Sequence, residues 1–153
     1  PNPRDFATHK HVLLTRHPRK VLKSYRAHID SPTALDLCYH HQKRWLERCD
    51  AEGWPVVVLD SDRLVAAPEQ TLRALMDWLG VDFDPCMLTW PAGPRQEDGP
   101  WAKYWYHRVH ASTGWEKVPA TDLDSLPPVE ERFLPLVAET EPLYELLRAR
   151  ALN

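Results

Sequence analysis

Two short apolar runs constrain the fold of this chain most strongly: HVLLT at residues 11–15 and VVVLD at residues 56–60. The second is a continuous β-branched run of the kind that parallel sheets bury on both faces. Two segments with helical spacing of apolar residues lie between the runs, and a third follows the second run. This α/β order, combined with right-handed crossovers, places both strands in one parallel sheet.

Proline, glycine and apolar spacing set the limits of the first two helices. The first begins at Pro18, which suits a first helical turn because its missing N–H needs no partner there. The second is expected from Ser31-Pro32 to Gly53. Its inner face is predicted from spacings of three and four to carry Leu35, Cys38, Gln42, Trp45 and Cys49.

The rest of the chain contains a third helix, a long loop and further helical segments. The third helix begins at Pro68 and ends before Gly80. Residues 81–100 contain several prolines and glycines and are expected to be loop. A helix through Trp101, Trp105 and Val109 is expected next, and a last helix at 129–152 should be broken or kinked by its two prolines.

Composition limits the class of protein. With 153 residues, 43% of them hydrophobic, the chain can form the core of one ordinary globular domain. Its three cysteines, Cys38, Cys49 and Cys86, match neither a disulfide framework nor a zinc ribbon, which favours a reducing, cytoplasmic compartment. No apolar run approaches the ~18 residues of a membrane span, so no membrane association is expected.

The charges are distributed unevenly along the chain. Residues 1–28 hold seven Lys or Arg against one Asp, while the remainder holds twelve against twenty-one Asp or Glu. Five of the cations fall between residues 16 and 26, a stretch without any carboxylate. This basic cluster predicts a bound anion, whereas the acidic remainder argues against a long track for nucleic acid.

Arg16 directly follows the first strand, where α/β sheets bind ligands and where the next helix presents its N-terminus. Its guanidinium and the hydroxyl of Ser24, on the following helix, suit a phosphate or a sulfate. A solvated basic helix face is the alternative that the residues alone leave open.

The segment LLTRHPRKVLKSYRAH resembles the second nucleotide motif of sulfotransferases that use 3′-phosphoadenosine 5′-phosphosulfate (PAPS): an apolar strand, then R-x-P-R/K, then a serine eight positions after the first Arg. Residues 56–85 and 99–117 resemble later segments of the same family, in the same order. The resemblance implies that Arg16 and Ser24 bind the 3′-phosphate of PAPS. It also implies transfer of a sulfuryl group, without a metal, to a hydroxyl or amine of a small-molecule acceptor.

The same resemblance implies a P-loop-NTPase-like parallel sheet flanked by helices, of which this chain is the C-terminal portion of a three-layer sandwich. The family's Gly-rich loop for the 5′-phosphosulfate precedes the first strand, and nothing before Lys10 matches it. We therefore expect residues 1–153 to be a single sulfotransferase-like domain without its N-terminal P-loop half. Such a domain should associate with that half, or with itself, through the open edge of the first strand.

Departures from the family pattern leave other functions open. Ser61-Asp62-Arg63 replaces an aromatic-acidic motif, and the Arg-Lys-Gly loop of animal members has no match, although Arg108, Lys117 or the backbone of 112–114 are candidates to replace it. The catalytic base is not identified. A non-catalytic anion- or nucleotide-binding or interaction domain on the same scaffold is the main alternative, and a small-molecule kinase that reads ATP is a third.

Other conspicuous residues have ordinary explanations beside the functional ones. His9 and His11 share a strand face but lack a third metal ligand, and His9 is also a candidate proton acceptor in a complete site. Aromatic faces suit either core packing or stacking on adenine or on an acceptor ring. The residues in question are Trp101, Tyr104, Trp105, Tyr106 and Trp115.

Overall fold

The computed structural model describes residues 3–116 and 126–152. Its sheet consists of two parallel strands, β1 (His11–Thr15) and β2 (Val56–Asp60), with Thr15 opposite Asp60. The crossover between them contains α1 (Pro18–Tyr25), α2 (Ala34–Leu37) and α3 (Tyr39–Glu52). The α/β order and the parallel pairing expected from the sequence are therefore confirmed.

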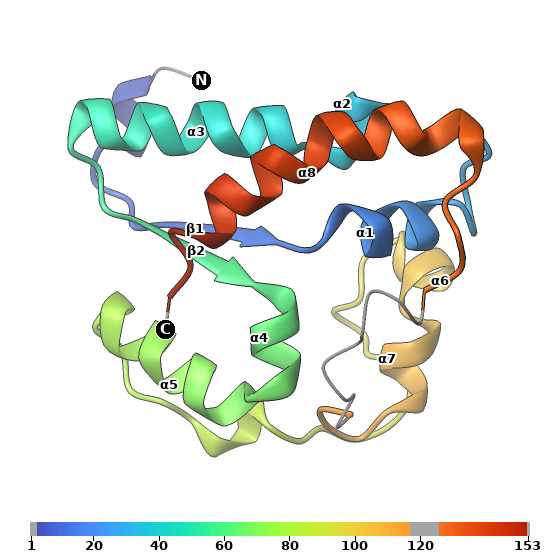
Figure 1. Ribbon diagram of the computed structural model, residues 1–153. Coiled ribbons are helices and arrows are strands. Elements are labelled where there is room, and N and C mark those ends of the chain that lie inside the picture. Colours follow the sequence, from blue (N-terminus) through green and yellow to red (C-terminus); the bar gives the residue numbers. More distant parts are fainter. Residues whose placement is uncertain (1–2, 117–125, 153) are drawn as a thin grey trace.

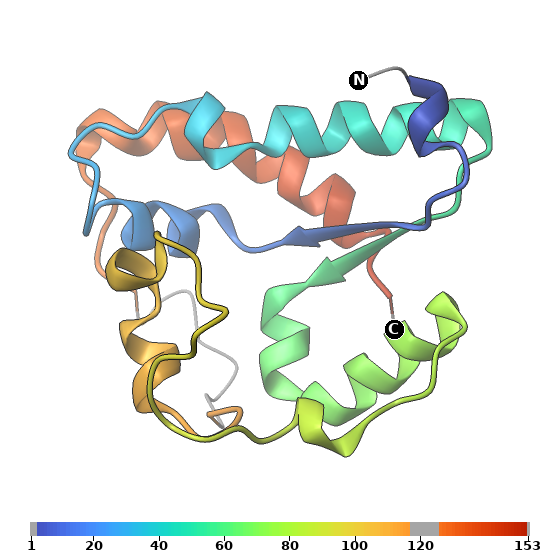
Figure 2. The ribbon, with the colours of Figure 1, turned by 180° about the vertical axis from the view of Figure 1, so that it is seen from behind.

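Helices flank the sheet on two sides, as Figures 1 and 2 show. α3 and α8 (Leu134–Arg148) lie on one side, where Leu46 and Leu147 pack with Val58 in the main core. α4 (Ser61–Ala66) and α5 (Pro68–Leu79) lie on the other side, where Leu75 packs with Val57 and Leu59. β2 is covered on both faces, which explains its continuous apolar sequence.

The two strands differ in how well they are covered. β2 pairs with β1 along one edge and with the C-terminal segment along the other. There, Val58 forms a parallel bridge with Ala151, and its carbonyl accepts a hydrogen bond from the Leu152 N–H at 2.8 Å. β1 is an edge strand, and Val12 and Leu14 on its α5-facing side are 39% and 55% exposed. Within the described residues only β2 pairs with β1, so the apolar edge expected for the HVLLT run is present.

The expected helix from Ser31 to Gly53 is wrong in one respect, because it is broken at Cys38. This residue adopts a left-handed conformation with φ 63°, and α2 ends before it while α3 begins after it. Leu35 and Cys38 are consequently exposed and do not belong to an inner stripe. The buried positions of α3 are Tyr39, Leu46 and Cys49.

Helix α5 has the limits that the sequence predicts, from Pro68 to Leu79, with Gly80 in the left-handed conformation at its end. α4 was not expected; Asp60 begins it by accepting hydrogen bonds from the N–H groups of Asp62 and Arg63. At 81–100 the chain is mostly loop, with one short 3-10 turn, η2 (Pro85–Met87).

The aromatic segment forms two short helices, α6 (Ala102–Trp105) and α7 (His107–Ala111), where one was expected. The last helical region begins with a 3-10 turn, η4 (Glu131–Phe133), and continues as α8. Pro135 lies in the first turn of α8, where proline fits, and only Pro142 lies inside the helix. Another 3-10 turn, η1 (Pro3–Phe6), precedes β1. Among the described helices, none has the length and apolar character to cross a membrane.

Candidate functional site

A cavity of about 1060 Å³ opens at the carboxyl ends of the two strands. β1 contributes Leu14 and Thr15 to its lining, Arg16 follows directly after the strand, and the first turn of α4 contributes Ser61 and Asp62. The opposite wall comes from the segment at 86–116. In Figures 1 and 2 the arrowheads of both strands point toward α1, α4 and the α6–α7 segment, which surround this region. This is the end of an α/β sheet where ligands bind.

The basic cluster divides into cations with structural partners and cations without them. Lys20 is only 5% exposed, and its Nζ lies 2.8 Å from Oδ2 of Asp62. Arg26 forms an ion pair with Glu130. Arg19 donates a long hydrogen bond of 3.4 Å to the carbonyl of Pro127. Much of the cluster therefore holds α1 in place.

Arg16 is the cation of this cluster that lines the cavity without a partner. Its side chain is exposed and makes no hydrogen bond or ion pair with the described residues, while its carbonyl accepts a 2.5 Å hydrogen bond from Tyr39 Oη. Ser24 is exposed on α1 and is not part of the cavity lining. The structure thus places Arg16 at the cavity and Ser24 outside its lining, with no hydrogen bond between the two side chains.

Both carboxylate oxygens of Asp60, at the end of β2, accept hydrogen bonds within the protein. Its Oδ1 accepts hydrogen bonds from the N–H groups of Asp62 and Arg63 at 2.8 and 3.1 Å, and its Oδ2 accepts one from Tyr144 Oη at 2.8 Å. Burial, followed by this hydrogen bond, raises the pKa of Tyr144. Asp60 is 2% exposed and joins β2, α4 and α8.

His17 connects the turn after β1 to α8. Its Nδ1 accepts a hydrogen bond from the Arg19 N–H at 3.3 Å, and its Nε2 lies 3.3 Å from Oε1 of Glu141. The ring meets Tyr144 edge-on at 5.1 Å. Burial lowers the pKa of His17 and outweighs the opposite effect of Glu141.

Three polar atoms of the cavity lining are buried without any hydrogen-bond partner in the described part of the chain. They are Thr15 Oγ1, Ser61 Oγ and Gln42 Oε1. Thr15 is 2% exposed, and the amide nitrogen of Gln42 donates to the Leu14 carbonyl at 3.0 Å, which leaves only the Gln42 oxygen free. Buried polar atoms normally have partners, so these three atoms are exceptions within the described residues.

The opposite wall of the cavity contains two tryptophans in a fixed arrangement. Trp90 and Trp115 meet edge-on with ring centroids 6.0 Å apart. The indole N–H of Trp90 donates to Ser112 Oγ at 3.1 Å, and that of Trp115 donates to the Met87 carbonyl at 3.0 Å. An antiparallel bridge between Thr89 and Gly114 joins the two segments. Both indole N–H groups are used internally, so the wall offers ring surface.

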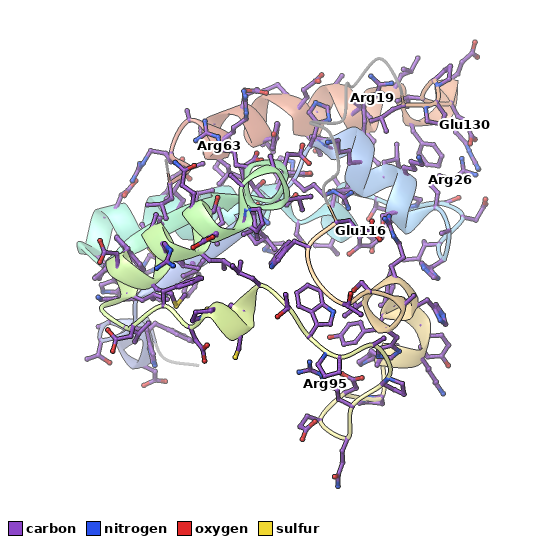
Figure 3. All side chains as sticks on the ribbon, turned by 90° about the horizontal axis from the view of Figure 1, so that it is seen from below. Arg19, Arg26, Arg63, Arg95, Glu116 and Glu130 are labelled. Carbon is purple, nitrogen blue, oxygen red and sulfur yellow. The ribbon has the colours of Figure 1, made fainter. Side chains whose placement is uncertain are left out.

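Some of the remaining aromatic and basic candidates line the cavity, and others do not. Tyr106 and Arg108 line the cavity, and Arg108 is paired with Glu116 at 2.6 Å. Trp101, Tyr104 and Trp105 do not line it; Trp105 packs on His28 with centroids 4.2 Å apart. Figure 3 shows Arg95 on the loop near α6 and α7, away from Arg19 and Arg26. Lys117 lies outside the described residues.

The histidine candidates have structural contacts. His11 Nε2 lies 3.2 Å from the Phe6 carbonyl, and its Nδ1 accepts a hydrogen bond from the Trp45 indole at 3.4 Å. His9 packs near the ring of Phe6, with centroids 6.0 Å apart. Among the described residues, no group of three or more His, Cys, Asp or Glu side chains is arranged to hold a metal ion.

The family model for the sulfotransferase domain matches residues 2–151, so this chain belongs to the sulfotransferase family. The family resemblance seen in the LLTRHPRK segment is therefore confirmed. Two curated proteins of Arabidopsis thaliana are similar to the chain. Branched-chain-amino-acid aminotransferase-like protein 1 is 38% identical over 143 residues, which cover 92% of this chain and 24% of the relative. Branched-chain-amino-acid aminotransferase-like protein 2 is 37% identical over 143 residues, which cover 91% of this chain and 24% of the relative.

The chain thus spans about a quarter of the length of these relatives, and their names transfer no activity to it. No solved structure matches the chain.

Sequence reasoning missed most of the polar lining of the cavity. The rule that ligands gather beyond strand ends was applied to Arg16, but it applies equally to Thr15, the last residue of β1, and to Ser61, directly after β2. A systematic reading of both strand ends would have found these two hydroxyls. Gln42 gave no such signal, because its contact with Leu14 arises from the packing of α3 on β1.

Proposed function

We propose that this chain is part of a PAPS-dependent sulfotransferase in which Arg16, together with Ser24, holds the 3′-phosphate of the cofactor. The observation that carries the proposal is the unpaired guanidinium of Arg16 at a large cavity, in a chain of the sulfotransferase family. A charge-assisted hydrogen bond from arginine to phosphate contributes about 1.5–3 kcal/mol. Because Lys20 and Arg26 have carboxylate partners, Arg16 is the cation of the cluster best suited to a ligand.

The proposed reaction moves a sulfuryl group from PAPS to an oxygen or nitrogen of a small-molecule acceptor. The S–O bond to the 5′-phosphate breaks, a bond from sulfur to the acceptor atom forms, the acceptor loses its proton, and adenosine 3′,5′-bisphosphate leaves. Like phosphoryl transfer, such a reaction depends mainly on positioning and on neutralising charge. Arg16 contributes to positioning by holding the 3′-phosphate, and the proposed chemistry requires no metal.

The 5′ end of the cofactor needs further donors, which we propose come from a P-loop half of the same protein or from an associated copy. Support comes from β1, whose outer edge is unpaired within the described residues and whose Val12 and Leu14 are exposed. An exposed apolar strand edge pairs readily with another strand.

Calorimetric titration with adenosine 3′,5′-bisphosphate tests the proposal. We expect Arg16→Ala to weaken binding roughly 10- to 150-fold, as the loss of one such interaction predicts. Ser24→Ala should weaken it less, because a neutral hydroxyl contributes about 0.5–1.5 kcal/mol. Arg73→Ala is the matched control, since Arg73 pairs with Glu69 on α5 and lies outside the cavity lining.

Two other outcomes would support the alternatives. If ATP binds as tightly as the bisphosphate, the site does not select a 3′-phosphate, and the kinase hypothesis gains. If the full-length protein binds the bisphosphate but transfers no sulfuryl group from PAPS to any of a panel of alcohols, phenols and amines, the non-catalytic binding domain is the better description.

A further inference from the structure

Arg16 combines a free side chain with a main chain whose neighbours are held firmly. Its guanidinium has no partner among the described residues, whereas Thr15 and His17 on either side are only 2% and 4% exposed. Thr15 is paired with Asp60 in the sheet. His17 caps α1, because its Nδ1 accepts a hydrogen bond from the Arg19 N–H. The position of the guanidinium therefore depends on what holds the main chain of Arg16 itself.

Tyr39, the first residue of α3, contacts that main chain directly. Its hydroxyl donates a hydrogen bond of 2.5 Å to the Arg16 carbonyl, and its side chain is 1% exposed in the main core. Burial raises the pKa of Tyr39, so the hydroxyl stays protonated and able to donate. About one helical turn later, the Gln42 amide donates to the Leu14 carbonyl at 3.0 Å. Two side chains of α3 therefore hold the end of β1 and the residue that follows it.

The break at Cys38 explains how Tyr39 reaches Arg16. Residues two apart on a continuous helix point in nearly opposite directions, so an unbroken helix could not direct both Leu37 and Tyr39 into one core. The structure buries both of them in the main core, with Cys38 between them in the left-handed conformation at φ 63°. This conformation is unfavourable for a residue with a side chain and persists only where the surroundings impose it. The break thus allows the hydroxyl of Tyr39 to meet the Arg16 carbonyl.

We infer that Tyr39 is a positioning residue, which holds the main chain of Arg16 so that the guanidinium stays at the cavity. The inference rests on the proposed function for the ligand, the 3′-phosphate of the cofactor. It adds that the selectivity for this phosphate depends on a buried hydroxyl that acts only through Arg16. A side chain whose main chain is already fixed loses less freedom on binding, so its interaction with an anion is stronger.

Calorimetric titration of the full chain with two nucleotides tests the inference. The probes are adenosine 3′,5′-bisphosphate and adenosine 5′-monophosphate, which lacks the 3′-phosphate. Tyr39→Phe removes only the hydroxyl and should weaken bisphosphate binding about 2- to 10-fold, as the loss of one hydrogen bond predicts. It should leave the binding of the monophosphate unchanged. Arg16→Ala should change the ratio of the two affinities in the same direction and by more.

Tyr144→Phe is the matched control. Tyr144 is 3% exposed, and its hydroxyl also donates one hydrogen bond, to Asp60 Oδ2 at 2.8 Å, but it lies outside the cavity lining. Both variants should lower the Tm, because each leaves a buried acceptor with one donor fewer. Only Tyr39→Phe should change the ratio of the two affinities. An equal change of this ratio in both variants would reflect general stability and would overturn the inference.

A double-mutant cycle shows whether Tyr39 acts through Arg16. If it does, Tyr39→Phe should have no further effect on bisphosphate binding once Arg16→Ala has removed the guanidinium. The double variant Arg16→Ala/Tyr39→Phe should therefore bind the bisphosphate as weakly as Arg16→Ala alone. If Tyr39→Phe causes the same fold loss with and without Arg16, the hydroxyl acts on the ligand independently, and the inference is wrong.

A measurement without ligand separates this inference from the proposed function. Hydrogen exchange followed by mass spectrometry should be faster in the segment 14–17 of Tyr39→Phe than in the same segment of Tyr144→Phe. Equal exchange in the two variants would overturn the hold on Arg16. If the unaltered chain does not bind the bisphosphate, the proposed function is refuted, and the exchange rates alone decide whether Tyr39 holds Arg16. If Arg16→Ala weakens bisphosphate binding but Tyr39→Phe does not, only the inference on Tyr39 fails.

Discussion

The carboxyl ends of the two strands occupy equivalent positions in the sheet, but their polar side chains differ in whether they have hydrogen-bond partners within the protein. At the end of β2, both carboxylate oxygens of Asp60 are used for hydrogen bonds within the protein. At the end of β1, the Thr15 hydroxyl has no partner in the described part of the chain, and neither has the Arg16 side chain beside it. Position in the topology thus identifies a candidate site, whereas an exposed charged side chain without a partner, here Arg16, shows which half of the site is available to a ligand.

The largest expected effect comes from Asp60→Ala. The variant removes the acceptor for two N–H groups of α4 and leaves the buried Tyr144 hydroxyl without its partner, so we expect a loss of about 2–4 kcal/mol in the free energy of unfolding. Urea unfolding measures it. Asp60→Asn keeps an oxygen for the N–H groups and should lose clearly less. Equal losses in the two variants would contradict the role of Asp60 as the cap of α4.

Lys20→Met should have the next largest effect. It removes the cation from a pair in which Asp62 remains 34% exposed, so solvent compensates part of the loss and we expect about 1–2 kcal/mol. The double variant Lys20→Met/Asp62→Asn should recover part of this stability, and a double-mutant cycle measures the coupling. Additive losses would show that the two side chains do not interact energetically.

The pH dependence of stability tests His17, which precedes α1 and contacts Glu141 and Tyr144 on α8. Its native pKa lies below the ordinary value of 6.5, so the unfolded chain binds more protons between the two values. Stability should therefore fall as the pH is lowered through 6.5 and level off below the native pKa. His17→Asn keeps an acceptor for the Arg19 N–H but does not titrate, and should show a shallower slope from pH 7 to 5.5. Identical slopes would refute the assignment.

The smallest effect on stability is expected for a substitution of Arg16 at the end of β1. Because its side chain contacts no partner in the described residues and is exposed, Arg16→Ala should change the free energy of unfolding by less than about 0.5 kcal/mol. Guanidinium unfolding provides the measurement. A loss of about 2 kcal/mol would mean that Arg16, like Asp60, stabilises the fold.

The sequence predicted those helices and strands whose limits are set by residues close together in the chain. β1, β2 and α5 follow from apolar runs and from Pro68 and Gly80, and the structure has them within a residue or two. The break at Cys38 carries no such signal, because cysteine rarely adopts the left-handed conformation found there. It arises where Leu37 and Tyr39, on either side, are both buried in the main core.

The candidate site was predictable only in its charged part. Arg16 stands out because the sequence around it lacks carboxylates, but which cations remain available depends on partners distant in the chain. Lys20 meets Asp62 and Arg26 meets Glu130, pairings that no local spacing indicates. The same applies to the wall, where Trp90 and Trp115 are brought together by the bridge between Thr89 and Gly114.

The pairing of β2 with the end of the described chain has a consequence for how the protein is made. A ribosome releases the chain from its N-terminus, so β1 and β2 can meet early, but the second edge of β2 is satisfied only when Ala151 and Leu152 emerge. α8, which covers the same sheet, also arrives late. Until then the central strand offers an unpaired edge to neighbouring nascent chains. We therefore expect the nascent domain to depend on chaperones during translation, and its folding to be completed by residues synthesised at the very end of this segment.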